Sequence, residues 1–450
     1  MILNNMPDSV PVCGLHEFGC IQGKFVYTAS MTLQSSSIID TIKTIFPACC
    51  HGRIFLVGGI VRDLLSGRSS SDIDLTATLS PHELVSSGFH RVSGKTTSAI
   101  WFRHDARHGT IEITPLTDLC GLEAELARRD FTINAIAMKL CGEIIDPLGG
   151  VDHHAQGLLK ACTDSSFDDD PLRIFRAFRF EADGWRMTDE TEALISCREW
   201  NRALEHIPVE RFSREMLKAL QANVPERFFQ RMLELEVGGN FLPELFRMPQ
   251  IPAGPLIHHP EGDLFSHSCQ VLQRVSAMTG DPLARFCAFF HDLGKLTSDP
   301  AHYPRHHGHD QAGYGLARTF CDRLRLPANY RNALAWTSRL HGTLNLWEQL
   351  RDSTRVRTAE QALRGGIADI LPLVSAADKT ETRPPGDWHE AVRVAGLTTA
   401  ELGIAPARLD ELPPGKRAEY IFQKKVQVFR SARAKPSVSH HPAPDPLPAP

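Results

Sequence analysis

The segment from Arg53 to Ala77, "RIFLVGGIVRDLLSGRSSSDIDLTA", decides the fold of the first half of the chain. Its apolar run "RIFLV" predicts a strand, and "IVRDLLSG" has the spacing of a short helix with a glycine just past its end. The pair Gly58 and Gly59 therefore lies at a strand-to-helix turn. "DIDL" predicts a second strand, on which Asp72 and Asp74 point to the same face.

These residue types together indicate chemistry on phosphates. Glycines lack Cβ atoms, so an anion can approach backbone N–H groups at the start of a helix, and Arg62 could reach the same phosphates. A Gly-Gly pair alone is more often an ordinary tight turn. However, Asp72 and Asp74, about 6.6 Å apart at Cα, offer the oxygen ligands that Mg²⁺ prefers. With the glycine turn directly upstream, this favours metal-assisted nucleotidyl transfer over two solvated acids.

Composition limits the class of protein. A chain of 450 residues predicts two to four domains, and 42% hydrophobic with 23% charged residues is typical of a folded globular protein. The net charge of −4 means that local basic patches must bind any polyanion. The 11 cysteines include no CxxC pair, which favours reduced thiols. Without a signal-peptide pattern or a run of 18 apolar residues, the sequence predicts a cytoplasmic protein with no membrane partner.

Three further motifs follow the first in order. They are "RRDFTINAIAM" (128–138), "DPLGGVDHHAQGLLKA" (146–161) and "FDDDPLRIFRAFRF" (167–180). Together the four motifs resemble the class II tRNA nucleotidyltransferase and poly(A) polymerase superfamily over residues 53 to about 245. The histidine-rich region downstream is similar to the HD domain that some bacterial CCA-adding or CC-adding enzymes of this superfamily carry.

The resemblance implies roles for individual residues. Those matching Asp72 and Asp74 bind the catalytic Mg²⁺ ions in the family. Asp170 and Arg173 match its base-reading pair; a carboxylate acceptor and a guanidinium donor can mimic the Watson–Crick edge of a partner base. The implied nucleotide-binding residues are Gly58, Gly59, Arg62, Asp63, Arg128, Arg129, Asp130, Asn134, Asp170, Arg173, Arg176 and Arg179. For the last two, a solvated helix stripe is an equally open interpretation.

A second constellation predicts a metal-dependent phosphohydrolase. "DLFSHSCQVL", "FFHDLGKL", "YPRHHGHDQAG", "SRLHG" and "SAADKTE" appear in the order expected of an HD domain. Imidazole and carboxylate ligands suit Ni²⁺, Mn²⁺, Co²⁺ or Mg²⁺. Any one histidine alone is more often a core or surface residue. The expected metal ligands are His267, His291, Asp292 and Asp378, while His306, His307, His309 and His341 could serve phosphate or a second metal.

The chain is therefore expected to have a multidomain α+β fold. A small mixed β-sheet forms the nucleotidyltransferase head, and all-α regions follow it. The expected boundaries are an N-terminal extension (1–48), the head (49–160), a helical neck and body for template and RNA binding (161–264), the HD domain (265–385), and a helical segment with a Pro-rich disordered tail (386–450).

The expected function is addition of C, and A where the enzyme is of the full CCA type, to the 3′ acceptor end of tRNA from CTP and ATP without a nucleic-acid template. Between Leu116 and Leu122 only Thr117–Gly121 remain, where CCA-adding relatives have a much longer loop. Family members that add only CC resemble this shortened form, and a short connection restricts hinge movement. This indicates CC addition, with full CCA addition as the open alternative. The alternatives are a poly(A) polymerase, an HD phosphodiesterase or phosphatase with an RNA-binding head, and a pure RNA-binding module.

Overall fold

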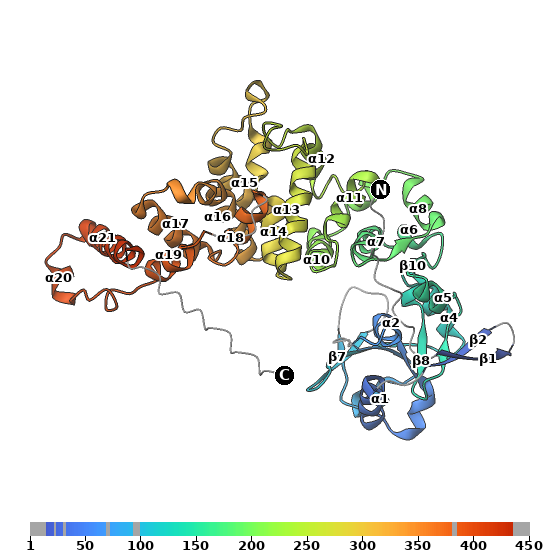
Figure 1. Cartoon of the computed structure of the whole chain (residues 1–450). Coiled ribbons are helices and arrows are strands. Elements are labelled where there is room, and N and C mark those ends of the chain that lie inside the picture. The colour runs from blue at the N-terminus through green and yellow to red at the C-terminus, as the bar shows by residue number, and fades with distance from the viewer. Residues whose placement is uncertain are drawn as a thin grey trace, which may run out of the picture. The chain divides into compact units, whose positions relative to one another are not determined.

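The computed structural model describes residues 15–21, 24–29, 33–68, 73–92, 100–379 and 385–434, with side chains from residue 37 onward (Figure 1). Asp72 and the Pro-rich C-terminal segment therefore lie outside the described residues. The chain forms two compact units, Met1–Ile207 and Pro208–Pro450. The first contains the sheet and the second is helical, so the expected α+β class is confirmed.

A seven-stranded mixed sheet forms the centre of the first unit. Its strand order is β5-β6-β7-β4-β3-β8-β9, with β4 and β7 parallel and the other neighbours antiparallel. A separate antiparallel hairpin joins β1 and β2. The strands are β1 (Leu15–Ile21), β2 (Lys24–Ala29), β3 (Ile54–Val57), β4 (Ile73–Ala77), β5 (His90–Val92), β6 (Ile100–Asp105), β7 (Gly109–Pro115), β8 (Ala137–Lys139), β9 (Ile144–Ile145), and the parallel pair β10 (Leu158–Leu159) and β11 (Arg186–Met187).

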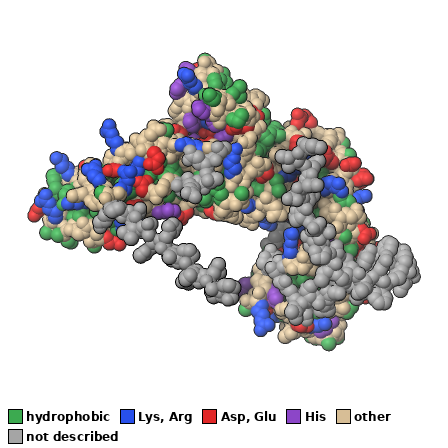
Figure 2. Space-filling model, in the orientation of Figure 1, with side chains coloured by type: hydrophobic (Ala, Val, Ile, Leu, Met, Phe, Trp, Pro, Cys, Tyr) green, Lys and Arg blue, Asp and Glu red, His purple; other side chains and the backbone are tan. Residues whose placement is uncertain are grey.

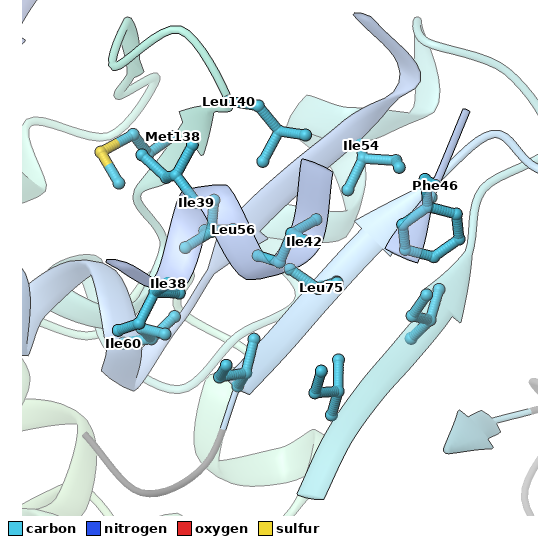
Figure 3. Packing of buried hydrophobic residues seen from close by; sticks show 14 of the residues in the cluster. Ile38, Ile39, Ile42, Phe46, Ile54, Leu56, Ile60, Leu75, Met138 and Leu140 are labelled. Carbon is cyan, nitrogen blue, oxygen red and sulfur yellow. The ribbon is translucent and has the colours of Figure 1, made fainter. Parts of the chain in front are cut away.

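Both faces of the sheet are buried at β3, and all four residues of this strand are accordingly apolar. Side chains alternate across a strand, so Leu56 joins the core that contains α1 (Leu33–Ile45), whereas Phe55 joins the core under α4 (Gly121–Ala127). Figure 3 shows Ile38 and Ile42 of α1 in the same cluster as Leu56. Helix α1, which the sequence analysis placed in an N-terminal extension, therefore packs as part of the head. Each such buried side chain contributes about 1.5–3 kcal/mol.

Helices complete the first unit. They are α2 (Gly59–Leu65), α3 (Pro81–Ser86), α5 (Gly150–Ala155), α6 (Ser166–Asp169), α7 (Leu172–Ala182), α8 (Asp189–Ser196) and α9 (Asn201–Leu204), with the 3₁₀ turns η1 (Ala48–Arg53) and η2 (Thr132–Asn134). Helix α7 begins after Pro171, which fits the first turn because proline has no N–H to leave unpaired. It buries Phe175 and Phe178 and leaves Arg173 and Arg176 half-buried.

The second unit is built from helices around an aromatic core that includes Phe286, Phe289 and Phe290. Its α-helices are α10 (Val209–Ala219), α11 (Glu226–Glu234), α12 (Pro243–Arg247), α13 (Leu264–Met278), α14 (Pro282–Phe290), α15 (His309–Arg323), α16 (Ala328–Asn345), α17 (Asp352–Gly365), α18 (Leu371–Asp378), α19 (Trp388–Ala395), α20 (Pro406–Asp410) and α21 (Pro414–Arg433). Its 3₁₀ turns are η3 (Met248–Gln250), η4 (Leu293–Thr297), η5 (Pro300–His302) and η6 (Trp347–Gln349).

Two expectations about environment can be compared with the structure. Within the described ranges, no helix has both the length and the hydropathy needed to cross a bilayer. The nine cysteines that the structure describes are all unpaired, as expected for reduced thiols.

Candidate active sites

The glycine turn has the predicted strand–turn–helix geometry. Strand β3 ends at Val57, Gly58 has φ +78°, and α2 begins at Gly59. A Cβ atom on Gly58 would lie 2.5 Å from Nη1 of Arg129 and 3.5 Å from Oδ2 of Asp74. Only glycine combines this φ with such close neighbours. The turn therefore meets a carboxylate and a guanidinium that come from distant parts of the sequence.

The carboxylate belongs to the predicted catalytic pair. Asp74 is half-buried on β4, whereas Asp72, its expected partner, lies outside the described residues. In the parallel register of β4 and β7, Asp74 pairs with Glu112. Paired residues of neighbouring strands point to the same face of a sheet, so Glu112 adds a second acid beside Asp74. Sequence reasoning missed Glu112, although the alternation of "TIEITP" could have placed it on that face.

Five predicted nucleotide-binding residues form one hydrogen-bonded network. Nη1 of Arg62 donates to Oδ1 of Asn134 (2.6 Å), and Nδ2 of Asn134 donates to Oδ1 of Asp130 (2.9 Å). Nε of Arg176 donates to Oδ2 of Asp130 (2.7 Å), and its Nη2 forms an ion pair with the same oxygen at 2.6 Å. Asp63 also accepts from Nη2 of Arg62 (2.9 Å). The network joins α2, η2 and α7.

Asp130 is the buried centre of this network and remains charged. Burial raises the pKa of its carboxyl group, but the charge of Arg176 and hydrogen bonds from Asn134 and the backbone of Phe131 outweigh that effect. The resulting pKa is about 2. Asp130 therefore orients Asn134 and Arg176 within the protein.

The predicted base-reading arginine is anchored before any nucleotide binds. Nη1 of Arg173 donates to the carbonyl and hydroxyl oxygens of Ser166 (3.1 and 3.0 Å), and Nη2 donates to the carbonyl of Arg128 (2.6 Å). Within the described residues, these bonds use three of its five N–H groups. Ser166 also donates to the carbonyl of Asp130 (3.1 Å). Asp170 accepts from the backbone N–H of Leu172 (3.2 Å).

Arg179 has a different environment from the other arginines of α7. Its Nη1 lies 3.7 Å from Oδ2 of Asp183, and its guanidinium lies over the ring of Phe180, 4.4 Å from the centroid. Arg62 lies over the same ring at 5.2 Å. The cation–π contact with Phe180 helps to hold the Arg62 guanidinium in position. Phe180 was not identified from the sequence, because a buried aromatic residue on a helix is usually only core.

The four expected HD ligands come together in the second unit. His267 lies on α13, His291 and Asp292 follow α14, and Asp378 ends α18. Nε2 of His267 is 3.6 Å from Oδ2 of Asp292 and 3.1 Å from Oδ1 of Asp378. Nε2 of His291 is 3.2 and 3.7 Å from the same two oxygens. Groups of these side chains could hold a metal ion.

The outer atoms of these ligands are fixed by hydrogen bonds. Nδ1 of His267 lies 2.7 Å from Oε1 of Glu261, and Nδ1 of His291 lies 2.8 Å from the carbonyl of Ala288. Because a carboxylate and a carbonyl only accept, both rings carry the proton on Nδ1 and present Nε2 to the centre. Nδ2 of Asn345 similarly donates to Oδ2 of Asp378 (2.7 Å). Sequence reasoning missed Glu261 and Asn345.

The buried centre contains polar atoms without hydrogen-bond partners, which a cation could bind. Nε2 of His267, Nε2 of His291 and Oδ1 of Asp292 are buried and lack a hydrogen-bond partner within the described residues. Burial lowers the pKa of His291, but the charge of Asp292 outweighs it and raises that pKa to about 10. A divalent cation bound there would displace that proton, because a histidine must be neutral at the nitrogen that binds a metal. Lys295 also pairs with Asp292 (2.6 Å).

The four additional histidines separate into two kinds. Nε2 of His309 and His341 lies 3.4 and 3.3 Å from Oδ1 of Asp292. His306 instead donates from Nε2 to the carbonyl of Pro252 (2.7 Å), and His307 is exposed. Figure 2 shows histidine side chains on the visible surface of the second unit, near the segment before α15. His309 and His341 therefore belong to the centre, whereas His306 supports the loop.

Family models match most of the chain. The model described as "Poly A polymerase head domain" matches residues 54–118 and 103–160, and "Probable RNA and SrmB- binding site of polymerase A" matches 186–248. The HD domain model matches residues 264–382. The order of the three models agrees with the order of the sequence motifs.

Relatives show the family of the chain, and solved structures show a similar fold. The "Multifunctional CCA protein" of Nitrosococcus oceani is 33% identical, covering 84% of this chain and 98% of the relative, and that of Methylococcus capsulatus is 30% identical, covering 85% and 96%. The Bacillus stearothermophilus CCA-adding enzyme in complex with CTP has a similar fold (TM-score 0.61, 24% identity, 89% of this chain and 93% of that chain). The Thermotoga maritima CCA-adding enzyme complexed with tRNA also does (TM-score 0.54, 20% identity, 85% and 91%). The chain belongs to the multifunctional CCA proteins, the tRNA nucleotidyltransferases that carry an HD domain.

Proposed function

We propose that the first unit adds cytidylate, and then adenylate, to the 3′ end of tRNA from CTP and ATP, releasing pyrophosphate. The observation that carries this proposal is the meeting of Gly58, Asp74 and Arg129 at one turn. The absent Cβ of Gly58 lets the guanidinium of Arg129 approach the turn, beside a carboxylate suited to binding a metal. A phosphate there could accept from Arg129 while its other oxygens face Asp74.

Asp72 and Asp74 are the proposed Mg²⁺ ligands. Bound Mg²⁺ would favour loss of the proton from the 3′-hydroxyl and neutralise charge on the leaving pyrophosphate. The chain's own groups hold the substrate. Arg128 and Arg129 are suited to the triphosphate, with Arg62 and Gly59 beside them, and Asn134 is suited to the sugar. Arg62 is already oriented by Asp63 and Asn134.

Base recognition is assigned to Asp170 and Arg173. Three hydrogen bonds to Ser166 and Arg128 fix the plane of the Arg173 guanidinium, so its remaining N–H donors are aimed before the base arrives. Preorganisation of this kind reduces the entropy that is lost on binding. Arg176 contacts Asp130, and Arg179 contacts Asp183, which supports a positioning role for both.

The number of nucleotides added is the test of this function. Purified protein would be incubated with tRNA that lacks its CCA end and with CTP, ATP or both, and the products would be sized. We expect two additions with CTP alone and a third only when ATP is also present. Two additions with no third would instead establish CC addition, the alternative raised by the short Thr117–Gly121 connection. Unlimited ATP addition would identify a poly(A) polymerase, and no addition would reject the proposal.

We further propose that the second unit hydrolyses phosphoesters at a divalent metal held by His267, His291, Asp292 and Asp378. Ni²⁺, Mn²⁺, Co²⁺ and Mg²⁺ all fit mixed imidazole and carboxylate ligands. A bound metal would polarise the phosphoryl group and supply a nucleophilic hydroxide. Glu261 and Asn345 hold their ligands in orientation.

Metal-stripped protein tests this second activity. Each of the four metals would be added back in turn, with p-nitrophenyl phosphate as a monoester and bis(p-nitrophenyl) phosphate as a diester. Release of p-nitrophenol that depends on one of the metals supports the proposal; no release with any metal would reject it.

Because the proposed substrates of the enzyme are tRNA and nucleoside triphosphates, and its described cysteines are unpaired, we place the enzyme in the cytoplasm.

A further inference from the structure

We propose that Phe102, with His90 beside it, is a stacking surface for the last base of the RNA that receives the new nucleotide. The inference rests on the proposed nucleotidyl transfer and goes beyond it, because it assigns residues to the RNA end rather than to the incoming nucleoside triphosphate. Both residues lie outside the four motifs on which the proposed site depends.

Four neighbouring strands place one residue each in a row that begins at the candidate catalytic carboxylate. Asp74 on β4 pairs with Glu112 on β7, and Glu112 pairs in turn with Phe102 on β6. Phe102 pairs with His90 on the edge strand β5, and the centroids of their rings are 6.2 Å apart. Because residues in register on neighbouring strands share a face of the sheet, the row runs along one face from Asp74 to the edge.

The opposite face of these strands is filled by the core of the head. The residues that alternate with the row belong to one buried cluster: Ile73, Leu75, Trp101, Ile111 and Ile113. Alternation directs the row residues to the other face. The Asp74 carboxylate there approaches the glycine turn, since its Oδ2 would lie 3.5 Å from a Cβ on Gly58. The row therefore leads away from the proposed site of transfer.

The ring of Phe102 is accessible to a ligand. Phe102 is 38% exposed, whereas Trp101, its neighbour on the core face, is 6% exposed. Single exposed apolar residues are common on protein surfaces, but this one lies in register with a candidate catalytic acid. Its neighbours in the row, Glu112 and His90, are exposed as well. The row is thus open on both sides of the ring.

The chemistry and the position of the ring suit a nucleic-acid base. Sheets of RNA-binding domains stack bases on exposed aromatic side chains, and such stacking accepts any base because each has a π face. Next to the carboxylates of Asp74 and Glu112, an uncharged ring suits a base better than a phosphate, which these acids would repel. Neighbouring strands are about 4.8 Å apart, so Phe102 lies about 10 Å from Asp74 along the row. An RNA whose 3′-hydroxyl lies at Asp74 can therefore extend its last base over the ring.

Binding of RNA in the absence of nucleotides tests the contact, because no addition takes place. The ligands would be tRNA that lacks its CCA end and the same RNA with an abasic site in place of its 3′-terminal base, and affinities would be measured by filter binding. Loss of one stacked base corresponds to about 5- to 150-fold in affinity. We expect Phe102→Ala to weaken binding of the complete RNA about 10-fold and binding of the abasic RNA less than about twofold, which is the coupling expected of a direct contact.

Two further variants control this experiment. Phe102→Trp keeps an aromatic face and should bind the complete RNA at least as tightly as the parent protein does. Val85→Ala removes another exposed apolar side chain of the first unit, one that lies on α3 and is 61% exposed, and it should bind both RNAs as the parent does. Equal losses with complete and abasic RNA, or unchanged binding of Phe102→Ala, would overturn the inference.

Kinetics separate the RNA end from the incoming nucleotide. We expect Phe102→Ala to raise KM for tRNA about 10-fold and to leave KM for CTP unchanged. A rise in KM for CTP alone would assign the ring to the incoming base and overturn the inference. A parent protein that shows the coupling to the terminal base but adds no nucleotide would reject the proposed transfer and retain the stacking surface. Normal addition without the coupling would do the reverse.

Discussion

The two candidate sites are built in different ways. In the head, a turn, a strand and a helix contribute side chains that remain partly accessible, and ion pairs such as Asp130 with Arg176 hold the arginines. In the HD centre all ligands come from helices and their ends, and His267, His291 and Asp292 are at most 2% exposed. An open site suits a substrate as large as a nucleotide on an RNA end, which must enter and leave. A closed, prealigned site suits an ion that stays.

The largest expected effects come from two variants that each remove the activity of one site and leave the activity of the other. Asp74→Ala should reduce nucleotide incorporation by about 10³-fold or more, because a metal-binding carboxylate is lost. Its metal-dependent phosphohydrolysis should stay at the parental level. His291→Ala should do the reverse. Incorporation and p-nitrophenol release would be measured on the same preparations, and loss of both activities in either variant would contradict this independence.

Gly58→Ala should reduce incorporation about 10²-fold. The new Cβ would lie 2.5 Å from Nη1 of Arg129 and displace it, and a shift of about 1 Å at a site can cost that much. Gly67→Ala is the matched control, since its φ is +66° and no neighbouring atom of the described residues lies within 4 Å of its Cβ position. It carries the same backbone strain, about 1 kcal/mol, without the collision. Equal kinetic losses in the two variants would show that strain alone explains the effect.

Sequence patterns predicted what depends on local order. The strand–turn–helix around Gly58 follows from apolar spacing and glycine, and the four candidate HD ligands, which the fold brings together, follow from their motifs. The pattern did not reveal what α1 packs against, because the helical spacing of Ile38 and Ile42 marks an apolar face and does not identify its partner. The role of α1 in the head core comes from its contact with β3, which is a tertiary property.

The missed site residues share the same reason. Glu261, Asn345 and Ser166 act by hydrogen bonds to residues that other segments supply. No local periodicity marks them, and each residue type is common on loops and helix ends. Ligands are thus easier to predict from sequence than the groups that orient them.

Asn345→Ala tests whether orienting groups matter in the closed site. Without the hydrogen bond to Oδ2, the Asp378 carboxylate can rotate away from His267 and His291. We expect about 10–100-fold weaker metal binding, the usual effect of losing such a partner, with incorporation unchanged. Metal affinity would be measured by competition with a chelating dye. Asn329→Ala, an exposed position at the start of the same helix, should bind metal normally; equal affinities in both variants would exclude a positioning role for Asn345.

Asp130→Asn tests the open site through the stability of the fold. The pKa of Asp130 is about 2 in the folded chain, against an ordinary value of 3.8. Because the folded value is the lower one, the ionised form stabilises the protein above about pH 4, and this contribution is lost as pH falls toward 2. The shift corresponds to about 2 kcal/mol at pH 7.

Asp130→Asn should therefore lower the free energy of unfolding of the first unit by about 2 kcal/mol at pH 7. This loss relative to the parent protein should fall to about half near pH 3. Denaturant unfolding at both pH values measures it. Asp168→Asn, in the exposed pair with Arg198, should cost less than about 1 kcal/mol. A pH-independent difference for Asp130→Asn would mean that lost hydrogen-bond geometry, rather than charge, stabilises this network. The arginines of the nucleotide site would then be held by hydrogen-bond geometry, as the candidate ligands of the HD centre are.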